Sequence, residues 1–347
     1  MLPKSNVVMA SGGQLAVVAD QTVAEFHSGA LTEQLPTGTP FLTFPSGEAS
    51  KSLVTAATIF DRLAQLRFER GGVIIAFGGG VAGDLAGFVA CTWLRGVRWI
   101  QVPTTLLAAV DASVGGKTGV NLATGKNLVG VFHQPAAVII DTDFLATLPD
   151  RDFVAGFAET VKQAAIRDPD FLKQAAIRDP DFLEWHETHA DALGARDAEA
   201  VAALIARNCE LKADIVARDE REASLRAILN YGHTIGHALE HLLEYDLRHG
   251  ECVALGILVE NEIACRRGVL SRAEADRVTA LLARLKLPDR LPRPVSAEDV
   301  LCACRVDKKV RAGAVNFVLL RAIGRPWQTA DVSADEVAGA LTVIAPA

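Results

Sequence analysis

Histidines recur at four-residue intervals in the segment NYGHTIGHALEH. They are His233, His237 and His241, and His249 follows shortly after in the sequence RHGE. Residues four apart share one face of a helix, so two of these histidines could bind one metal ion through neutral imidazoles. A single histidine is more often structural, but three on one stripe with a fourth nearby favour a metal or phosphate site.

An acidic residue is expected to complete such a site, because a catalytic zinc ion has three protein ligands and an open position. Spacing alone leaves Glu159, Glu222 and Glu251 as alternatives. Glu159 and Lys162 are three residues apart in an expected helix, where both side chains can face one pocket. The motif HExxH is absent, so the pattern does not predict a zincin-type protease.

A glycine-rich turn occurs at residues 78–84, which read GGGVAGD. It follows an expected strand, opens an expected helix and matches G-x-G-x-x-G, in which a backbone turn and a helix N-terminus bind a pyrophosphate. A tight turn with only a structural role is the alternative. The strand before it and the helix after it favour nucleotide binding.

Two Gly-Lys pairs lie in the segment DASVGGKTGVNLATGKN, residues 111–127. Neither is a Walker A loop, because the first has Asp111 where a glycine is needed and the second has one residue too many between its glycines. Lys117 and Lys126 in glycine-rich loops could still bind a phosphate as point charges. Two solvated lysines are an equally good interpretation of this stretch alone.

The elements that carry these residues predict an α/β half followed by a helical half. Short apolar runs at residues 15–18, 41–44, 72–77, 99–102 and 137–140 are expected strands, and residues 52–67 have helical periodicity. Parallel strands joined by helices bind ligands at their carboxyl ends. From about residue 150 helical periodicity dominates, and residues 315–320 could form a late hairpin strand. We therefore expect a nucleotide-binding domain at residues 1–150, a helical domain at residues 151–347, and an active site in the cleft between them.

The chain has 347 residues, half of them hydrophobic, and a formal net charge of −7. This balance argues against a nucleic-acid or anionic-membrane partner, since both require basic surface. The six cysteines are scattered without CxxC spacing, which is typical of free thiols in a reducing compartment. The sequence has no signal-peptide pattern and no apolar run of about 20 residues, so we expect a cytoplasmic protein without membrane spans.

The undecapeptide KQAAIRDPDFL occurs twice in direct tandem, at residues 162–172 and 173–183. Eleven residues are about three helical turns, so a second copy could preserve the phase of a helix. Pro169 and Pro180 suit the first turn of a helix, with Asp168 and Asp179 as caps. We therefore expect the duplication to add a helix–turn unit after the preceding helix.

Six motifs, in a fixed order, give the chain a resemblance to a known family. They are GGGVAGDLAGF, LRGVRWIQVPTTLLAAVDASVGGKTGVN, GKNLVGVFHQP, AETVK, NYGHTIGHALE and HGE. Together they resemble 3-dehydroquinate synthase over nearly the whole chain, from about Asp20 onward. The resemblance implies a Rossmann-like α/β domain followed by an all-α domain, with NAD, a zinc or cobalt ion and a homodimer.

The resemblance also implies roles for individual residues. Glu159, His233 and His249 match the metal ligands. The residues that match NAD contacts are Asp20, Glu48, Lys51, Gly79, Gly80, Asp84, Thr104, Thr105, Phe144 and Thr147. Those that match groups around the substrate phosphate are Lys117, Asn127, Asn230, His237 and Lys309. Lys212 and Arg226 match a pair of cations that binds the substrate carboxylate. Arg95 matches an arginine that reaches the active site of the neighbouring subunit. The further active-site residues are matched by Asp111, Lys126, Lys162 and Glu222.

The implied substrate is a sugar-phosphate acid, 3-deoxy-D-arabino-heptulosonate 7-phosphate, which the family converts to 3-dehydroquinate and phosphate in the shikimate pathway. In the implied scheme NAD transiently oxidises the C5 hydroxyl and so acidifies C6, phosphate leaves by elimination, the hydride returns, and an aldol step closes the carbocycle. A metal would act as a Lewis acid on the C4 and C5 hydroxyls. Lysines would stabilise the leaving phosphate, and two cations would select an acid over a neutral sugar phosphate.

Several alternatives remain at this point. The family usually reads K-Y-G after the ligand glutamate, whereas this chain reads Lys162-Gln-Ala, and the duplication offers Lys173 as a second candidate. Lys162 is preferred because it keeps the E-x-x-K spacing. A related cyclase acting on sedoheptulose 7-phosphate would have no use for a carboxylate clamp. An iron-type alcohol or glycerol dehydrogenase is expected to have Asp-x-x-x-His where this chain has ETVK. A non-enzymatic paralogue disabled by the duplication would lack metal or turnover.

Overall fold

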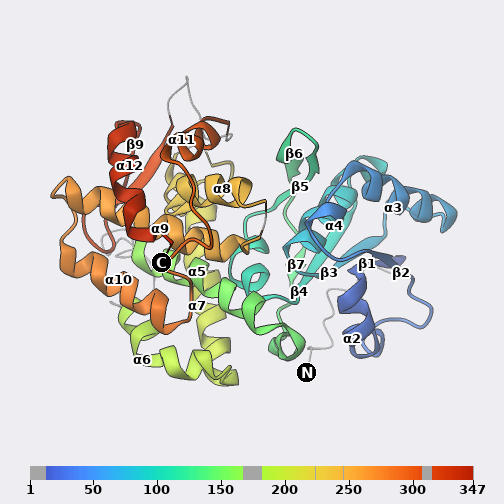
Figure 1. The fold of residues 1–347 in the computed structure, drawn as a ribbon. Helices are drawn as coiled ribbons and strands as arrows, with labels where there is room; N and C mark the ends of the chain where they lie inside the picture. Colours follow the sequence, from blue (N-terminus) through green and yellow to red (C-terminus); the bar gives the residue numbers. More distant parts are fainter. Residues whose placement is uncertain (1–12, 167–181, 223, 245, 307–314, 347) are drawn as a thin grey trace. The chain divides into compact units, whose positions relative to one another are not determined.

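The computed structural model describes residues 13–166, 182–222, 224–244, 246–306 and 315–346. The chain divides into two compact units, with the boundary between Pro149 and Asp150 (Figure 1). The first unit is built on a parallel sheet, and the second is mainly helical. The predicted fold class is therefore confirmed.

A parallel five-stranded sheet forms the centre of the first unit. Its strands are β1 (Leu15–Asp20), β2 (Phe41–Phe44), β3 (Val73–Gly78), β4 (Arg98–Pro103) and β7 (Ala137–Val138), in the order β2-β1-β3-β4-β7. Val17 of β1 pairs with Ile75 of β3, and Ile75 pairs with Ile100 of β4. Every residue of β3 is buried, as expected of a parallel strand that is covered on both faces. The five strands expected from the sequence all occur, with ends shifted by one or two residues.

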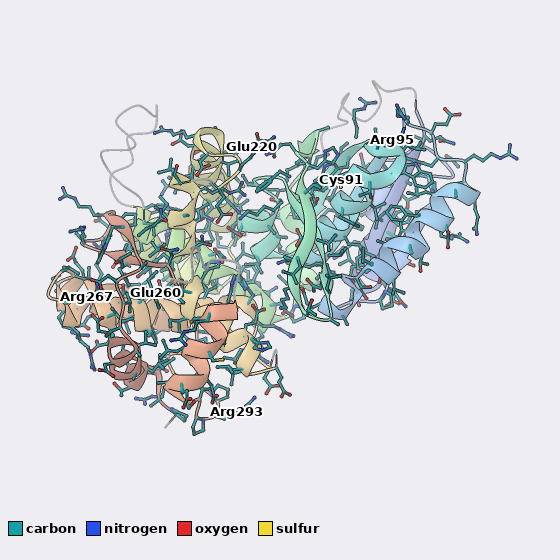
Figure 2. The ribbon with its side chains drawn as sticks, turned by 90° about the horizontal axis from the view of Figure 1, so that it is seen from above. Cys91, Arg95, Glu220, Glu260, Arg267 and Arg293 are labelled. Carbon is teal, nitrogen blue, oxygen red and sulfur yellow. The ribbon has the colours of Figure 1, made fainter. Side chains whose placement is uncertain are left out.

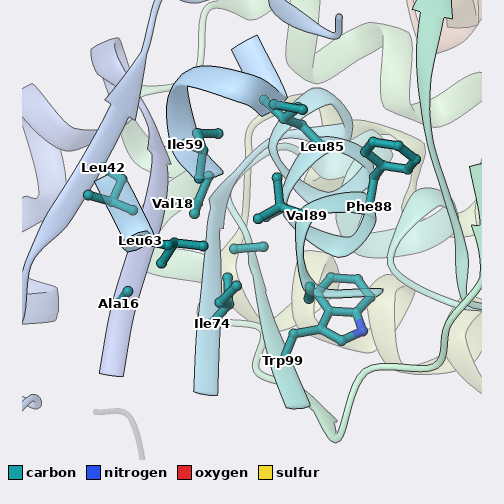
Figure 3. Packing of buried hydrophobic residues seen from close by; sticks show 14 of the residues in the cluster. Ala16, Val18, Leu42, Ile59, Leu63, Ile74, Leu85, Phe88, Val89 and Trp99 are labelled. Atoms are coloured by element: carbon teal, nitrogen blue, oxygen red, sulfur yellow. The ribbon is translucent and has the colours of Figure 1, made fainter. Parts of the chain in front are cut away.

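Helices cover both faces of this sheet. α3 (Leu53–Gln65) and α4 (Gly80–Thr92) contribute to one core cluster, and α2 (Gln21–Thr32) contributes to the other. Alternate residues of β1 divide between them, because successive side chains of a strand point to opposite faces. Ala16 and Val18 lie in the α3–α4 core, which Figure 3 shows from close by, and Val17 lies in the α2 core. Each fully buried aliphatic or aromatic side chain contributes about 1.5–3 kcal/mol.

A hairpin of β5 (Lys117–Leu122) and β6 (Gly125–Phe132) occupies the segment in which we expected two glycine-rich loops. Gly119 and Gly130 are cross-strand partners, and a Cβ on Gly130 would lie 2.1 Å from the Thr118 carbonyl oxygen. The glycines thus permit close pairing of two strands. The expectation that Lys117 and Lys126 lie in loops was wrong, because glycine was taken as a sign of irregular backbone.

The second unit is organised around one buried helix. α9 (His249–Arg266) is buried at every position from Gly250 to Ala264, which identifies it as central. It packs against α5 (Asp150–Ile166), α8 (His233–Leu242), α10 (Arg272–Arg284), α12 (Ala334–Leu341) and β8 (Phe317–Leu320). The other helices are α6 (Phe182–Gly194), α7 (Ala198–Arg218) and α11 (Ala297–Val306). β8 pairs with β9 (Pro326–Thr329), which confirms the late hairpin. Within the described ranges, no helix has the length and apolar character needed to span a membrane.

The repeated undecapeptide is shared between two helices. α5 ends at Ile166, inside the first copy, and α6 begins at Phe182, inside the second. Lys162 is therefore part of α5, where it is 1% exposed. His186 of α6 lies with its Nε2 3.0 Å from the Thr160 hydroxyl of α5, so the two helices are in direct contact. The expected caps and helix starts at Asp168, Pro169, Asp179 and Pro180, and the alternative Lys173, lie outside the described residues.

Removal of one copy tests whether the duplication is tolerated. Because the copies are identical, deleting residues 167–177 gives the same sequence as deleting residues 173–183. We expect the shortened protein to keep α5 and α6, because deleting residues 167–177 leaves every residue of both helices in place. Urea unfolding should give a free energy of unfolding within about 1 kcal/mol of the full chain. A loss of several kcal/mol, or loss of helical circular dichroism, would show that the extra copy has become structurally necessary.

Candidate metal and nucleotide sites

A buried carboxylate lies at the centre of the candidate site in the second unit. Glu159 of α5 is fully buried, and its Oε2 forms an ion pair with the Lys162 ammonium one turn later. Its other oxygen, Oε1, lies 3.2 Å from His233 Nε2 and 3.4 Å from His249 Nε2. The two histidines are the first residues of α8 and α9. Three helices thus contribute one ligand-type atom each.

The spacing of these three atoms fits a divalent metal ion. In a tetrahedral site with metal–ligand distances of about 2.1 Å, the ligand atoms lie about 3.4 Å apart. The separations of 3.2 and 3.4 Å match that edge length. One carboxylate and two imidazoles with an open fourth position are also a donor set that catalytic zinc sites use.

A third histidine joins this group, and a fourth does not. The ligand atoms of His233, His237 and His249 all lie within 4.8 Å of one another. His241 is exposed at the end of α8. Each helical residue turns by about 100°, so position i+8 is rotated by about 80° from position i. Two of the three histidines expected on one face of the helix, His233 and His237, therefore lie together. His249, from the start of α9, is the third histidine of the cluster.

Crossed ion pairs fix the start of α9 against the start of α5. Arg151 donates to both oxygens of Glu251, each at 2.7 Å, and Arg248 Nε lies 2.7 Å from Asp152 Oδ1. Glu251 Oε2 also accepts the Arg248 backbone N–H and so caps α9. Gly250 lies in the same contact, where a Cβ would meet the Ala155 carbonyl oxygen at 1.8 Å. These contacts hold His249 beside Glu159.

The same contacts show where the three acidic residues that the sequence left open lie. Glu251 is taken up by Arg151 and by the α9 backbone, so it acts as a helix cap. Glu222 has a positive φ of 57° and accepts a hydrogen bond from the Asn230 amide at 3.0 Å. Glu159 is the carboxylate that lies beside the histidines.

The charge state of the metal-free site follows from this geometry. Burial would raise the pKa of the Glu159 carboxyl, but the charge of Lys162 and the neighbouring histidines hold that pKa well below its usual range. Burial lowers the pKa of His249, but hydrogen bonds to Glu159 and Glu240 outweigh it and raise the pKa to about 10. Without a metal ion, the site therefore combines a carboxylate with an imidazolium at neutral pH.

Two buried cations lie on neighbouring elements of the second unit. Lys212 of α7 is 5% exposed, and Arg226 of the 3-10 turn Leu225–Asn230 is 2% exposed. The Asp219 carboxylate accepts the backbone N–H groups of Ser224 and Arg226 and so holds this turn against the end of α7. Arg226 Nη1 also donates to the Glu220 carbonyl oxygen at 2.7 Å. Two buried cations on packed elements are groups that can bind an anionic ligand.

In the first unit, the residues matched to NAD contacts gather at the carboxyl ends of the strands. Asp20 ends β1 and caps α2, Gly79 and Gly80 follow β3, and Thr104 and Thr105 follow β4. Among the described residues, no side chain caps the N-terminus of α4, and the buried Thr104 hydroxyl has no hydrogen-bond partner. A helix N-terminus and an unsatisfied hydroxyl together fit a bound pyrophosphate.

Different constraints require glycine at different positions of residues 78–83. Gly78 has a φ of 150°, and a Cβ there would lie 2.6 Å from Ala82 Cβ. A Cβ on Gly79 would lie 2.9 Å from the Thr105 methyl group, and one on Gly83 would lie 2.1 Å from Gln101 Nε2. The turn and the approach of α4 to β4 both depend on the missing side chains.

A charged network connects the turn after β2 to α4. Lys51 is 5% exposed and lies 2.9 Å from Asp84 Oδ2 and 3.3 Å from Glu48 Oε1. Asn121 of β5 donates its amide to Glu48 at 2.8 Å, and its Oδ1 accepts the Asn127 backbone N–H. Sequence reasoning did not identify Asn121, and its position in a Gly-rich segment gave little signal for it.

Phe144 and Thr147 lie on a 3-10 turn, Thr142–Thr147, after β7. Phe144 is 4% exposed, and its ring packs edge to face against Phe77 with 5.2 Å between the ring centroids. Phe144 is therefore part of the hydrophobic core on one face of the sheet. The Thr147 hydroxyl lies 2.6 Å from His27 Nε2. Both residues are thus close to β3 and α2, with little of Phe144 accessible to a ligand.

The remaining predicted residues are more scattered. Asp111 lies on a short π-helical turn, Ala108–Ala112, after β4. Lys117 opens β5, and Lys126 and Asn127 lie on β6, with Asn127 at a φ of 53°. All of these belong to the first unit, whereas Asn230 and His237 belong to the second. Lys309 lies outside the described residues.

Arg95 is exposed on a turn that follows α4 (Figure 2). Leu94 and Arg95 have φ values of 49° and 68°, and Gly96 has a φ of 117°. Leucine rarely adopts positive φ, so this conformation is strained. The turn holds both the Leu94 and the Arg95 side chains at the surface.

Comparison with known proteins matches both halves of the chain. Residues 41–155 match the family described as 3-dehydroquinate synthase N-terminal, and residues 170–310 match 3-dehydroquinate synthase C-terminal. The chain is 47% identical over 324 residues to 3-dehydroquinate synthase from Azotobacter vinelandii, which covers 92% of this chain and 85% of the relative.

Two solved structures have a similar fold and carry ligands. The first is 2-epi-5-epi-valiolone synthase from Streptomyces hygroscopicus with NAD⁺ and Zn²⁺ bound, with a TM-score of 0.86 and 27% identity over 98% of this chain and 93% of that chain. The second is 2-deoxy-scyllo-inosose synthase with carbaglucose-6-phosphate, NAD⁺ and Co²⁺, with a TM-score of 0.84 and 26% identity over 98% of this chain and 91% of that chain.

The charge state of the histidines predicts how zinc binding depends on pH. A histidine binds a metal only through a nitrogen that carries no proton, so zinc bound to His249 would displace the proton that this side chain holds in the metal-free site. Because the pKa of His249 is raised, zinc affinity should rise with pH through the neutral range and fall as pH is lowered. Calorimetric titration at pH 7.5 in two buffers of different ionisation enthalpy should show release of about one proton per zinc. Equal apparent enthalpies in both buffers would contradict this assignment.

Proposed function

The chain belongs to the 3-dehydroquinate synthase family, and we propose that Glu159, His233 and His249 bind its catalytic metal ion. The activity of the family is that of an enzyme of the shikimate pathway, which forms a carbocycle and releases phosphate from a sugar-phosphate acid. The observation that carries the assignment of the ligands is the position of Glu159 Oε1, within 3.4 Å of both histidine nitrogens. Zinc and cobalt are the ions proposed, because both suit this donor set.

The metal ion supplies Lewis acidity to substrate hydroxyl groups when it is bound. The proposed ligands are a fully buried carboxylate and two imidazoles, which three packed helices hold close together. Lys162 balances the charge of Glu159 on the side away from the histidines and keeps its carboxylate ionised. In this proposal His237, one turn after His233, contacts the substrate beside the ion.

When bound, NAD would supply reversible hydride transfer. We propose that it binds to the first unit, with its pyrophosphate at Gly79, Gly80 and the N-terminus of α4. Thr104 and Thr105 would contact it from the end of β4, and Asp20 from the end of β1. Glu48, Lys51 and Asp84 would hold the surrounding turn in place through their ion pairs. Phe144 and Thr147 complete the proposed contacts.

Charge selects the substrate in this proposal. Lys212 and Arg226 bind the carboxylate, because two buried cations stabilise a second anionic group that a sugar phosphate without a carboxylate lacks. Lys117, Asn127, Asn230, His237 and Lys309 contact the phosphate and stabilise it as it leaves. Asp111, Lys126 and Glu222 are the further residues proposed for the active site.

Turnover of the acid substrate tests this function directly. Purified protein with NAD and zinc or cobalt should release phosphate from 3-deoxy-D-arabino-heptulosonate 7-phosphate and form 3-dehydroquinate, identified by mass spectrometry. Sedoheptulose 7-phosphate should not be turned over, since it lacks the carboxylate. Turnover of sedoheptulose 7-phosphate alone would overturn the proposal, and so would metal-loaded protein that is inactive on both substrates.

The same assay tests the carboxylate clamp. Arg226→Ala should raise KM for the acid substrate by roughly 10- to 100-fold, as expected for loss of a charge-assisted contact worth about 1.5–3 kcal/mol. NAD affinity, measured by fluorescence, should be unchanged. An unchanged KM would show that Arg226 does not bind the substrate.

We further propose a homodimer in which Arg95 acts in the partner's active site. Its exposure on a strained turn favours a contact outside its own unit. A turn at the surface can present a charged side chain to a second copy, and a two-fold dimer would use the contact twice.

Hybrid dimers test this arrangement. Arg95→Ala and His249→Ala should each be inactive alone. Co-expressed in equal amounts, they should recover about a quarter of wild-type activity, because half the dimers are hybrids and each hybrid has one complete site of two. No recovery, despite hybrids isolated by two affinity tags, would show that Arg95 acts within its own subunit, and an Arg95→Ala variant that is active alone would show that Arg95 has no role in the active site.

A further inference from the structure

The second ring nitrogen of His249 faces another carboxylate. His249 Nε2 points to Glu159, and its Nδ1 lies 3.5 Å from Glu240 Oε2. Glu240 lies in the last full turn of α8, and its side chain is 13% exposed. The imidazole is therefore held between two carboxylates from different helices.

We propose that Glu240 is a positioning residue that orients His249 and raises the affinity of the site for its metal ion; this inference rests on the proposed function of His249 as a ligand. A histidine that binds a metal through one nitrogen carries a proton on the other. A carboxylate that accepts a hydrogen bond from this N–H fixes the tautomer and the ring plane, and makes the coordinating nitrogen a stronger electron-pair donor.

The position of Glu240 in its helix supports this role. The C-terminal end of a helix carries partial negative charge, so a carboxylate there is unfavourable for the helix. Glu240 lies two residues before the end of α8, and a neutral or basic residue would suit the helix better. Glu240 lies 3.5 Å from His249 Nδ1, where its charge can act on the imidazole.

Contacts that do not involve Glu240 hold the start of α9 in place. The start of α9 is already fixed by the pairs Arg151–Glu251 and Arg248–Asp152. Gly250 adds a backbone contact with Ala155. A change at position 240 should therefore alter the ring of His249 more than the position of its helix.

Zinc affinity of the full-length, metal-free protein tests the inference. We would measure it by competition with a chromophoric chelator for the wild type, Glu240→Gln and Glu240→Ala. The amide can still accept a hydrogen bond but lacks the charge, so Glu240→Gln should bind zinc about tenfold more weakly. Glu240→Ala should approach the roughly 100-fold end of the range seen for such residues. Glu199→Gln, the same change at an exposed position of α7, should leave the affinity unchanged.

A spectroscopic measurement separates positioning from general stability. Visible bands of the cobalt-substituted protein report on ligand geometry, and they should shift in both Glu240 variants but not in Glu199→Gln. Zinc affinity and cobalt bands equal to those of the wild type would overturn the inference. So would a Glu240→Gln protein that loses helical circular dichroism without metal, because Glu240 would then be needed for folding. A wild type that does not bind zinc would overturn the proposed ligands, and the inference with them.

Discussion

The buried charge of Glu159 is the constraint on which the second unit depends. A carboxylate that is removed from water needs compensating charge, and loss of one partner of a buried pair costs about 3–5 kcal/mol. Glu159 is fully buried, and its compensation comes from Lys162 on the same helix and from His233 and His249 on two others. A metal ion is the most concentrated counter-charge that these side chains can share. The packing of α5, α8 and α9 therefore brings His233 and His249 to one atom, Glu159 Oε1.

Small residues make that packing possible. A Cβ on Gly250 would lie 1.8 Å from the Ala155 carbonyl oxygen, so α9 meets α5 backbone to backbone. A Cβ on Gly256 would lie 1.9 Å from the Gly232 carbonyl oxygen, where α9 meets the start of α8. The buried Glu260 then accepts the Gly232 backbone N–H at 2.7 Å, and Tyr231 donates to Asn261 at 2.5 Å. The two histidine-bearing helix ends are thus fixed by contacts that side chains larger than hydrogen would block.

The fold was largely predictable from the sequence, and the site was predictable in part. Buried parallel strands such as β3 are continuous apolar runs, which are visible without any partner. The spacing of His233 and His237 also needed only the helical period. The choice among Glu159, Glu222 and Glu251 could not be made from spacing, because it is decided by where Arg151 and Asn230 lie in three dimensions.

Other features escaped sequence reasoning for similar reasons. The β5–β6 hairpin was taken for loops, because its glycines serve strand pairing across the hairpin. Glu240 is separated from His249 by a turn and a change of helix, so no periodicity connects them. Asn121 acts through Glu48, which lies far earlier in the chain. In each case the missing information is a contact between residues distant in sequence.

The proposed metal ligands and the proposed NAD contacts divide cleanly along the chain. Glu159, His233 and His249 all follow the boundary at Pro149, and the NAD contacts all precede it. A ligand that binds only the folded form stabilises it by an amount that grows with the logarithm of its concentration. On this division, each ligand acts first on the melting of its own unit, so zinc would raise one thermal transition and NAD the other. A calorimetric scan would then record cofactor occupancy of the two units as two separate temperatures.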